Sequence, residues 1–198
     1  MEYSDIAPMM GNLWSPLAAV SSHWEERDNA QLCLSIGGAS IVPEHPRVVV
    51  QIYKTNLSHE MISGSGSFAL NFPRAGQLEW IRDFGLHSGR ERDKLATVEF
   101  SRGRTGSPLF VDCWGWLDCV VVNAMDGGDM TCFLAEVVDG RTIGPGQPLW
   151  WREARTRVPE EWMRLYSEKQ GREVDYSRAH MDEIDPTLWS TRSLRSLG

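Results

Sequence analysis

The alternation of apolar and polar positions predicts a chain of short strands separated by turns. Residues 48–52 form an apolar run typical of a buried strand, and residues 67–72 give a second strand signal. The longest signal covers residues 114–123, and residues 130–138 follow as its expected antiparallel partner. The sequence Asp-Gly-Gly-Asp at 126–129 lies between them and is typical of a hairpin turn.

A short helix is expected between the first two of these strands. Ser58 stands in a favourable N-cap position, and the glycines at 64 and 66 mark the end of the helix. The strand before it therefore delivers Lys54, Asn56 and Ser58 to a helix N-terminus, where free N–H groups and a lysine favour an anion. Taken alone, the stretch also fits a capped surface helix with a solvated lysine.

The remaining pattern favours an antiparallel barrel. Residues 13–22 and 29–36 are strand candidates, residues 98–100 form a short one, and residues 74–84 and 160–169 have helical spacing. Long crossover helices between successive strands, which a parallel sheet requires, are missing from the pattern. Many strands with few short helices indicate a mainly β protein with a closed or partly closed barrel.

Composition narrows the range of partners. The chain has 198 residues, 41% of them hydrophobic and 24% charged, with a formal net charge of −7. This charge argues against nucleic-acid binding, which needs clustered Lys and Arg. No apolar run approaches the length of a membrane helix, and the first residues do not resemble a signal peptide. We therefore expect a cytoplasmic protein without a membrane partner.

The cysteines and histidines do not form a metal-binding pattern. The four cysteines are not spaced as a C-x-x-C pair, so a zinc site is not expected, and they are interpreted as reduced thiols: Cys33, Cys113, Cys119 and Cys132. The sequence also offers no Ser-His-Asp set or paired carboxylates, and no catalytic acid or base is assigned.

Four stretches together carry a family resemblance. The pattern K-x-N-x-[ST], then isoleucine and G-x-F-x-x-N, is matched between Lys54 and Asn71, and S-G-R-x-x-D-K is matched from Ser88 to Lys94. The other two stretches are residues 29–46 and the hairpin region around residues 118–140. In this order and spacing, over about residues 12–145, the chain resembles the flavin reductase-like family of FMN-binding split barrels.

The resemblance implies an architecture. It implies a six-stranded antiparallel split barrel with a few short helices, which dimerises and binds flavin near the subunit interface. We expect the flavin-binding domain to cover residues 1–145. Residues 146–198 are expected to form a C-terminal extension that packs on the barrel or on the dimer partner. Nine tryptophans supply apolar surface that a homodimer can bury.

The resemblance also implies a cofactor site. The segment from 29 to 40 lines the flavin ring, and the motif residues hold the ribityl chain and phosphate. The residues so assigned are Asn29, Cys33, Ser35, Gly37, Ser40, Lys54, Asn56, Ser58, Ser88, Arg90 and Lys94. A flavin phosphate needs N–H donors and positive charge, which the two motifs supply. FMN is the expected cofactor, with FAD as an alternative and NADH or NADPH as co-substrate.

One departure bears on activity. Many family members carry a histidine after the acidic hairpin turn, in a role associated with nicotinamide, whereas this chain has Met130. A thioether packs against a flat substrate but cannot orient it by hydrogen bonding, and Met130 is expected at the substrate side. The leading hypothesis is a flavin reductase that uses a nicotinamide dinucleotide and serves a partner monooxygenase. The alternatives are an FMN-retaining protein with another substrate and a non-catalytic flavin-binding barrel.

Overall fold

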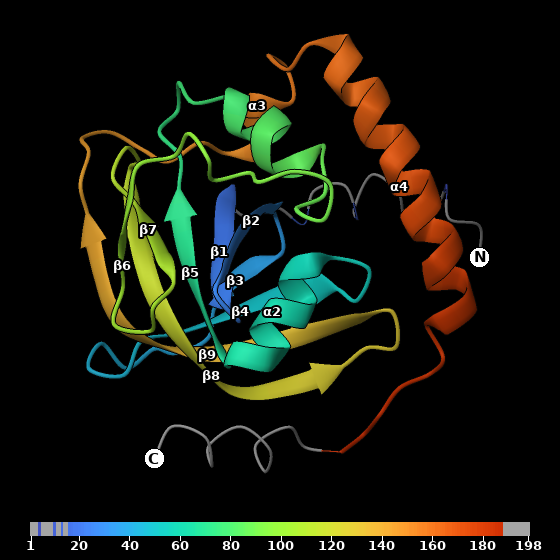
Figure 1. The fold of residues 1–198 in the computed structure, drawn as a ribbon, viewed down its shortest axis with the longest axis horizontal. Helices are drawn as coiled ribbons and strands as arrows, with labels where there is room; N and C mark the ends of the chain where they lie inside the picture. Colours follow the sequence, from blue (N-terminus) through green and yellow to red (C-terminus); the bar gives the residue numbers. More distant parts are fainter. Residues whose placement is uncertain (1–3, 5–9, 11–12, 14–15, 188–198) are drawn as a thin grey trace.

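A curled antiparallel sheet forms the body of the described chain (Figure 1). The computed structural model describes residues 4, 10, 13 and 16–187. Seven strands pair in the order β2-β1-β5-β8-β9-β4-β3. Their bounds are Ala18–Trp24 for β1, Arg27–Cys33 for β2, Ile36–Gly38 for β3, Arg47–Tyr53 for β4, Ser67–Phe72 for β5, Gly115–Asp126 for β8 and Met130–Thr142 for β9. A separate two-stranded ribbon pairs β6 (Phe100–Arg102) with β7 (Pro108–Phe110).

The two edges of the sheet meet where β2 passes into β3. Only Leu34 and Ser35 separate these strands, yet β2 and β3 stand at opposite ends of the strand order. The backbone N–H of Gln51 in β4 donates to the carbonyl of Ser35 at 3.0 Å, which ties the two edges together. The predicted antiparallel split-barrel class is confirmed, but the main sheet has seven strands rather than six. The three-residue strand β3 begins at Ile36, where the predicted strand at 29–36 ends.

The long hairpin of β8 and β9 forms the middle of the sheet. Its strands pair from Gly115 opposite Thr142 to Asp126 opposite Thr131, with register shifts near Asp118 and Val121. Such shifts bend a strand and increase its twist, which helps a sheet to curl. The predicted turn at 126–129 is confirmed, and the predicted β5 strand has the observed bounds.

Apolar side chains fill the inside of the curl. The largest buried cluster joins six strands through residues such as Val50, Phe68 and Phe133, all at most 1% exposed. A second cluster packs Trp80 against Phe84 and Phe110 in T-shaped contacts, with the three ring centroids 5.3–5.4 Å apart. This second cluster fixes the segment that carries the S-G-R motif against the outside of β1 and β2.

Helix α2 (Leu57–Ser65) covers one end of the sheet. Its N-cap residue is Asn56, so the expectation that Ser58 caps the helix is wrong. Ser58 lies within the first turn and is buried, and its hydroxyl accepts a hydrogen bond from Asn29 instead. The helix ends as predicted at Gly66, which has φ 70°, and its N–H donates to the carbonyl of Ile62.

Three further helical segments lie outside the barrel. The expected helix at 74–84 is a short π-helical turn, η1 (Ile81–Gly85). Two helices follow the barrel: α3 (Trp151–Ala154) and α4 (Glu160–His180), which is twice as long as the predicted segment at 160–169. Figure 1 shows α4 crossing one side of the barrel from the α3 region toward the tip of the β8–β9 hairpin. Among the described helices, none has both the length and the apolarity to cross a membrane.

Candidate functional site

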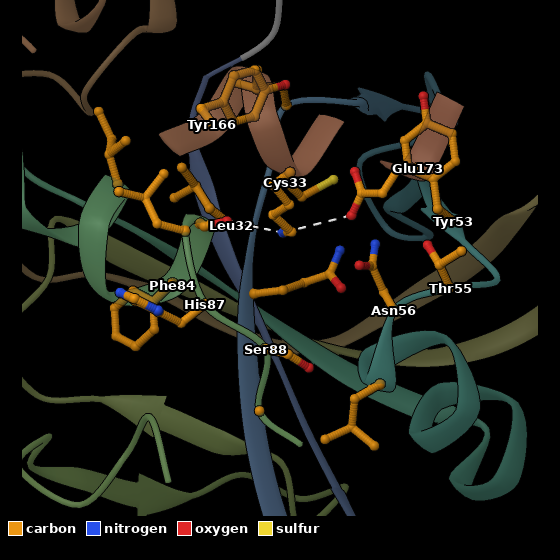
Figure 2. A pocket seen from close by; sticks show the side chains of 18 of the residues that line it. Leu32, Cys33, Tyr53, Thr55, Asn56, Phe84, His87, Ser88, Tyr166 and Glu173 are labelled. Atoms are coloured by element: carbon orange, nitrogen blue, oxygen red, sulfur yellow. Dashed lines mark hydrogen bonds and ion pairs between the residues drawn. The ribbon is translucent and has the colours of Figure 1, made fainter. Parts of the chain in front are cut away.

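A pocket of about 420 Å³ opens between the barrel and α4 (Figure 2). Four segments line it: β2 and the residues after it, the end of β4 with the start of α2, the loop from η1 to Lys94, and the helices α3 and α4. Its volume lies within the range usual for small-molecule sites. The pocket therefore lies between strand ends, the start of α2 and a loop, and α4 covers it.

The pocket brings together six of the twelve residues assigned from sequence. They come from three segments that are distant in the chain: Asn29, Cys33, Ser35, Asn56, Ser88 and Lys94. Figure 2 shows Cys33, Asn56 and Ser88 arranged around the same space. Burial raises the pKa of the Cys33 thiol to about 11, so this side chain is present as a neutral thiol.

Two predicted cations, Lys54 and Arg90, do not line this pocket. Each forms an ion pair with an acidic side chain. The ammonium of Lys54 lies 2.8 Å from the carboxylate of Asp126 on the β8–β9 hairpin. The guanidinium of Arg90 pairs with Glu60 at 2.8 Å and also donates to the carbonyl of Thr55. Both partners come from other parts of the sequence, and each neutralises the charge that was expected to face a phosphate.

The other four assigned residues also lie away from the pocket lining. Ser58 is buried under Asn29, and Gly37 belongs to β3 with Ser40 just beyond it. The hydroxyl of Ser40 accepts from the N–H of Val42 in the loop. Met130 begins β9 directly opposite Tyr53, so its side chain stands next to a pocket residue without lining the pocket.

Lys94 is the assigned cation that does line the pocket. Its ammonium donates to the backbone carbonyls of Ala30 at 2.9 Å and Phe84 at 3.1 Å. Within the described residues, no carboxylate forms an ion pair with it. Burial, followed by the charges of Lys169 and Arg92, lowers the pKa of Lys94 to about 7. A half-buried cation without a carboxylate partner favours an anionic ligand.

Two buried oxygen atoms at the pocket lack a hydrogen-bond partner among the described residues. They are the side-chain amide oxygen of Gln31 and the hydroxyl of Thr55. A buried polar atom without a partner is costly, and native structures contain few of them. Their position in the lining therefore indicates a ligand that supplies hydrogen-bonding groups.

Flat and apolar side chains complete the site. Leu32 and Phe84 belong to one side, and Tyr53 and Tyr166 stand on either side of Glu173 in Figure 2. Burial, with the charges of Asp129 and Glu173, raises the pKa of Tyr53, which stays protonated at neutral pH. The arrangement suits a ligand with an aromatic ring and an anionic end.

The residues contributed by α4 were not found by motif matching. They are Trp162, Met163, Tyr166, Lys169, Arg172 and Glu173. The signal was present in the spacing 162, 166, 169 and 173, which places those side chains on one face of a helix. The helical spacing was recognised only at residues 160–169, and residues 146–198 were expected only to pack on the barrel or on the dimer partner.

Histidine and metal chemistry are not prominent in this site. His87 lines the pocket, and burial and the Arg92 charge lower its pKa. His59 lies outside the lining and contacts the Thr131 hydroxyl at 2.8 Å; burial and the Lys54 charge lower its pKa to about 4. In the described part of the chain, no group of three His, Cys, Asp or Glu side chains is arranged to hold a metal ion.

Comparison with known proteins shows that this chain is similar to flavin reductases. The chain is 32% identical over 95 residues to an NADH-dependent FAD reductase of Streptomyces globisporus, covering 47% of this chain and 52% of that protein. It is 26% identical over 121 residues to the reductase subunit of a flavin-dependent monooxygenase from Mycobacterium tuberculosis, covering 61% and 62% of the two chains. The chain thus spans about half to three fifths of the length of these relatives.

The fold is also similar to that of a solved flavin reductase structure. A solved structure of the NADH:FAD oxidoreductase of Streptomyces globisporus, in complex with NAD and FAD fragments, aligns with a TM-score of 0.67 and 23% identity. The alignment covers 78% of this chain and 90% of that one, which supports the shared fold. The family profile described as "Flavin reductase like domain" matches residues 10–159. Because that match covers most of the chain and the whole curled sheet, this protein belongs to the flavin reductase-like domain family.

Proposed function

We propose that this chain is an oxidoreductase that binds FMN in the pocket between the barrel and α4 and reduces it with a nicotinamide dinucleotide. The observation that carries the proposal is the lining of that pocket. It holds motif residues from β2, from the β4–α2 connection and from the S-G-R loop in one place. FAD remains the alternative flavin, and NADH or NADPH is the proposed reductant.

The residues present fit a flavin. The unpartnered oxygens of Gln31 and Thr55 need hydrogen-bond donors, which the heteroatoms of a flavin ring and ribityl chain offer. Lys94 offers a positive charge to a phosphate, and the apolar side chains of Leu32 and Phe84 suit a ring. When bound, the flavin supplies the electron chemistry of the reaction. The chain's own residues bind it, orient it and exclude water from it.

The proposed partners follow from the same family membership. The relative from Mycobacterium tuberculosis is named as the reductase subunit of a flavin-dependent monooxygenase. By analogy, a monooxygenase is the proposed acceptor of the reduced flavin. A homodimer is also proposed, and it is supported by exposed apolar side chains in the loop after β3, where Ile41 is 100% exposed and Val42 46%. The cytoplasmic location expected from the sequence stays a prediction.

The function is tested with the purified full chain. We expect FMN titration to give saturable binding. We also expect FMN to stimulate the oxidation of NADH or NADPH, which is measured as the loss of absorbance at 340 nm. Saturable FMN binding without nicotinamide oxidation would support the flavin-binding barrel without reductase activity. The absence of saturable binding of both FMN and FAD would reject the proposal. Light scattering with FMN present tests the homodimer, which a monomer at micromolar concentration contradicts.

A further inference from the structure

Helix α4 lies across the pocket but outside the matched family domain. The family match ends at residue 159, and α4 begins at Glu160. The helix contributes six residues to the pocket lining. None of its 21 residues, all of which the structure describes, is fully buried. A helix that packs on a filled core along its whole length normally buries an apolar stripe. In α4, Trp162 packs against a buried cluster that includes Ile81 and Leu149, yet it stays half-buried.

Four half-buried side chains of α4 that line the pocket form a stripe. Trp162, Tyr166, Lys169 and Glu173 follow one another at intervals of four, three and four residues, which places them on one face. Each of the four is partly exposed and lines the pocket. In Figure 2, Tyr166 and Glu173 extend from the helix ribbon that covers the pocket. The stripe is therefore exposed to the cavity and would be buried by a ligand within it.

The helix is held to the barrel at two distant places. In its first half, the guanidinium of Arg82 lies 5.5 Å from the centre of the Trp162 ring, and Lys169 donates to the carbonyl of Gly85 at 2.9 Å. At its end, the backbone comes so close to the hairpin turn that a Cβ on Gly128 would be 2.4 Å from the carbonyl oxygen of Met181. Two residues of the stripe, Trp162 and Lys169, make the first of these attachments, and Tyr166 lies between them in the sequence.

Lys169 also joins the stripe to η1. Besides its bond to Gly85, its ammonium lies 3.7 Å from the carboxylate of Glu173, one turn further along α4. Because η1 carries Gly85 and α4 carries Glu173, the lysine links the helix to the loop that bears the S-G-R motif. This link holds Tyr166 in position above the pocket.

We infer that α4 is the outer wall of the flavin site, and that Trp162 and Tyr166 contact the bound flavin while Lys169 positions the helix. This inference rests on the proposed function and extends it by assigning ligand-binding residues beyond the family domain. Aromatic side chains suit a flat ring, and burying them against it stabilises the complex. The same contact slows release of the flavin.

The test compares variants of the full chain in FMN titrations. Trp162→Ala and Tyr166→Ala are each expected to weaken FMN binding about 2- to 10-fold, mainly through faster dissociation. The matched control is Tyr176→Ala, which removes the same side chain from the same helix outside the pocket lining, where Tyr176 stacks on His180. A second control is Arg164→Ala, on the exposed face of α4. Both controls are expected to bind FMN as the wild type does.

Hydrogen exchange of the wild-type chain gives an independent readout. FMN is expected to slow amide exchange in residues 160–175, because the ligand holds the stripe against the barrel. If wild-type FMN binding is normal but Trp162→Ala and Tyr166→Ala bind equally well and exchange in α4 is unchanged, the assignment of α4 is wrong and the flavin function stands. If the wild type binds no flavin, the proposed function fails and takes this inference with it.

Discussion

The amide nitrogen of Asn29 donates a hydrogen bond to the hydroxyl of Ser58 across 2.8 Å, and both side chains are buried. The bond joins β2 to the first turn of α2, two elements that meet at the pocket. The sequence patterns had assigned both residues to the cofactor. Within the barrel they bind each other, so the first effect of changing either one falls on the fold.

Replacement of Ser58 is expected to lower stability. Ser58→Ala leaves the buried amide of Asn29 without its acceptor, which costs about 1–3 kcal/mol in free energy of unfolding. Urea denaturation followed by circular dichroism measures the change. Ser63→Ala, an exposed serine of the same helix, is the control and should change stability by less than about 0.5 kcal/mol. Equal stabilities for the two variants would contradict the structural role of this bond.

The glycine of the S-G-R motif is required by the same contact. A Cβ at Gly89 would be 2.1 Å from the side-chain oxygen of Asn29, so Gly89→Ala must displace either Asn29 or the loop. We expect a loss of about 1–3 kcal/mol in stability from the disturbed Asn29–Ser58 pair. The control is Gly76→Ala, where a Cβ meets no atom within 4 Å. Denaturation curves that coincide for the two variants would show that the loop gives way freely.

Binding of an anionic flavin is expected to depend on pH through Lys94. The pKa of this lysine in the free protein is lowered to about 7 by burial and by the charges of Lys169 on α4 and Arg92 in its own loop, while Glu91 opposes the shift. A bound phosphate favours the charged form and raises that pKa. The affinity is therefore full below pH 7 and falls as the pH rises above it, by at most about tenfold per pH unit.

Titration of FMN between pH 7.5 and 9, where the phosphate stays doubly ionised, measures this dependence. Lys94→Met is expected to bind FMN more weakly at pH 7 and to lose the pH dependence. The matched control is Lys54→Met, since Lys54 pairs with Asp126 outside the pocket lining and should leave the pH profile unchanged. Parallel profiles for the wild type and Lys94→Met would remove Lys94 from the phosphate site.

The contrast between Lys54 and Lys94 shows which features the sequence could predict. The strands, the hairpin turn at 126–129 and the end of α2 at Gly66 depend on local patterns, and they were found from such patterns. The state of each motif cation depends on a residue far away in the chain. Asp126 lies 72 residues after Lys54, and nothing near Lys54 reveals that this carboxylate neutralises it.

The lining of the pocket depends on distant contacts in the same way. Motif matching found the strand and loop residues that line the pocket, such as Asn56 and Ser88, because those segments are continuous in sequence. The wall formed by α4 depends on where a helix after the barrel comes to rest. That position is set by contacts such as Lys169 with Gly85, which join residues 84 positions apart. Amphipathic spacing marks the helix but does not state what it covers.

The hydroxyl of Thr55 gives the last prediction, because stability and affinity should respond to its removal in different ways. This buried oxygen has no hydrogen-bond partner among the described residues, and it lines the pocket. Thr55→Val keeps the shape of the side chain and removes the unpartnered group. The free energy of unfolding of the flavin-free protein should therefore stay unchanged or rise slightly. FMN affinity should fall by about 0.5–1.5 kcal/mol, since the ligand loses one hydrogen bond.

The control is Thr131→Val, which removes the partner of His59 at 2.8 Å outside the pocket lining. That variant should lose about 1 kcal/mol of stability and keep its FMN affinity. Chemical denaturation and FMN titration of both variants check the crossed pattern, and unchanged FMN affinity in Thr55→Val would show that the flavin does not bind this hydroxyl.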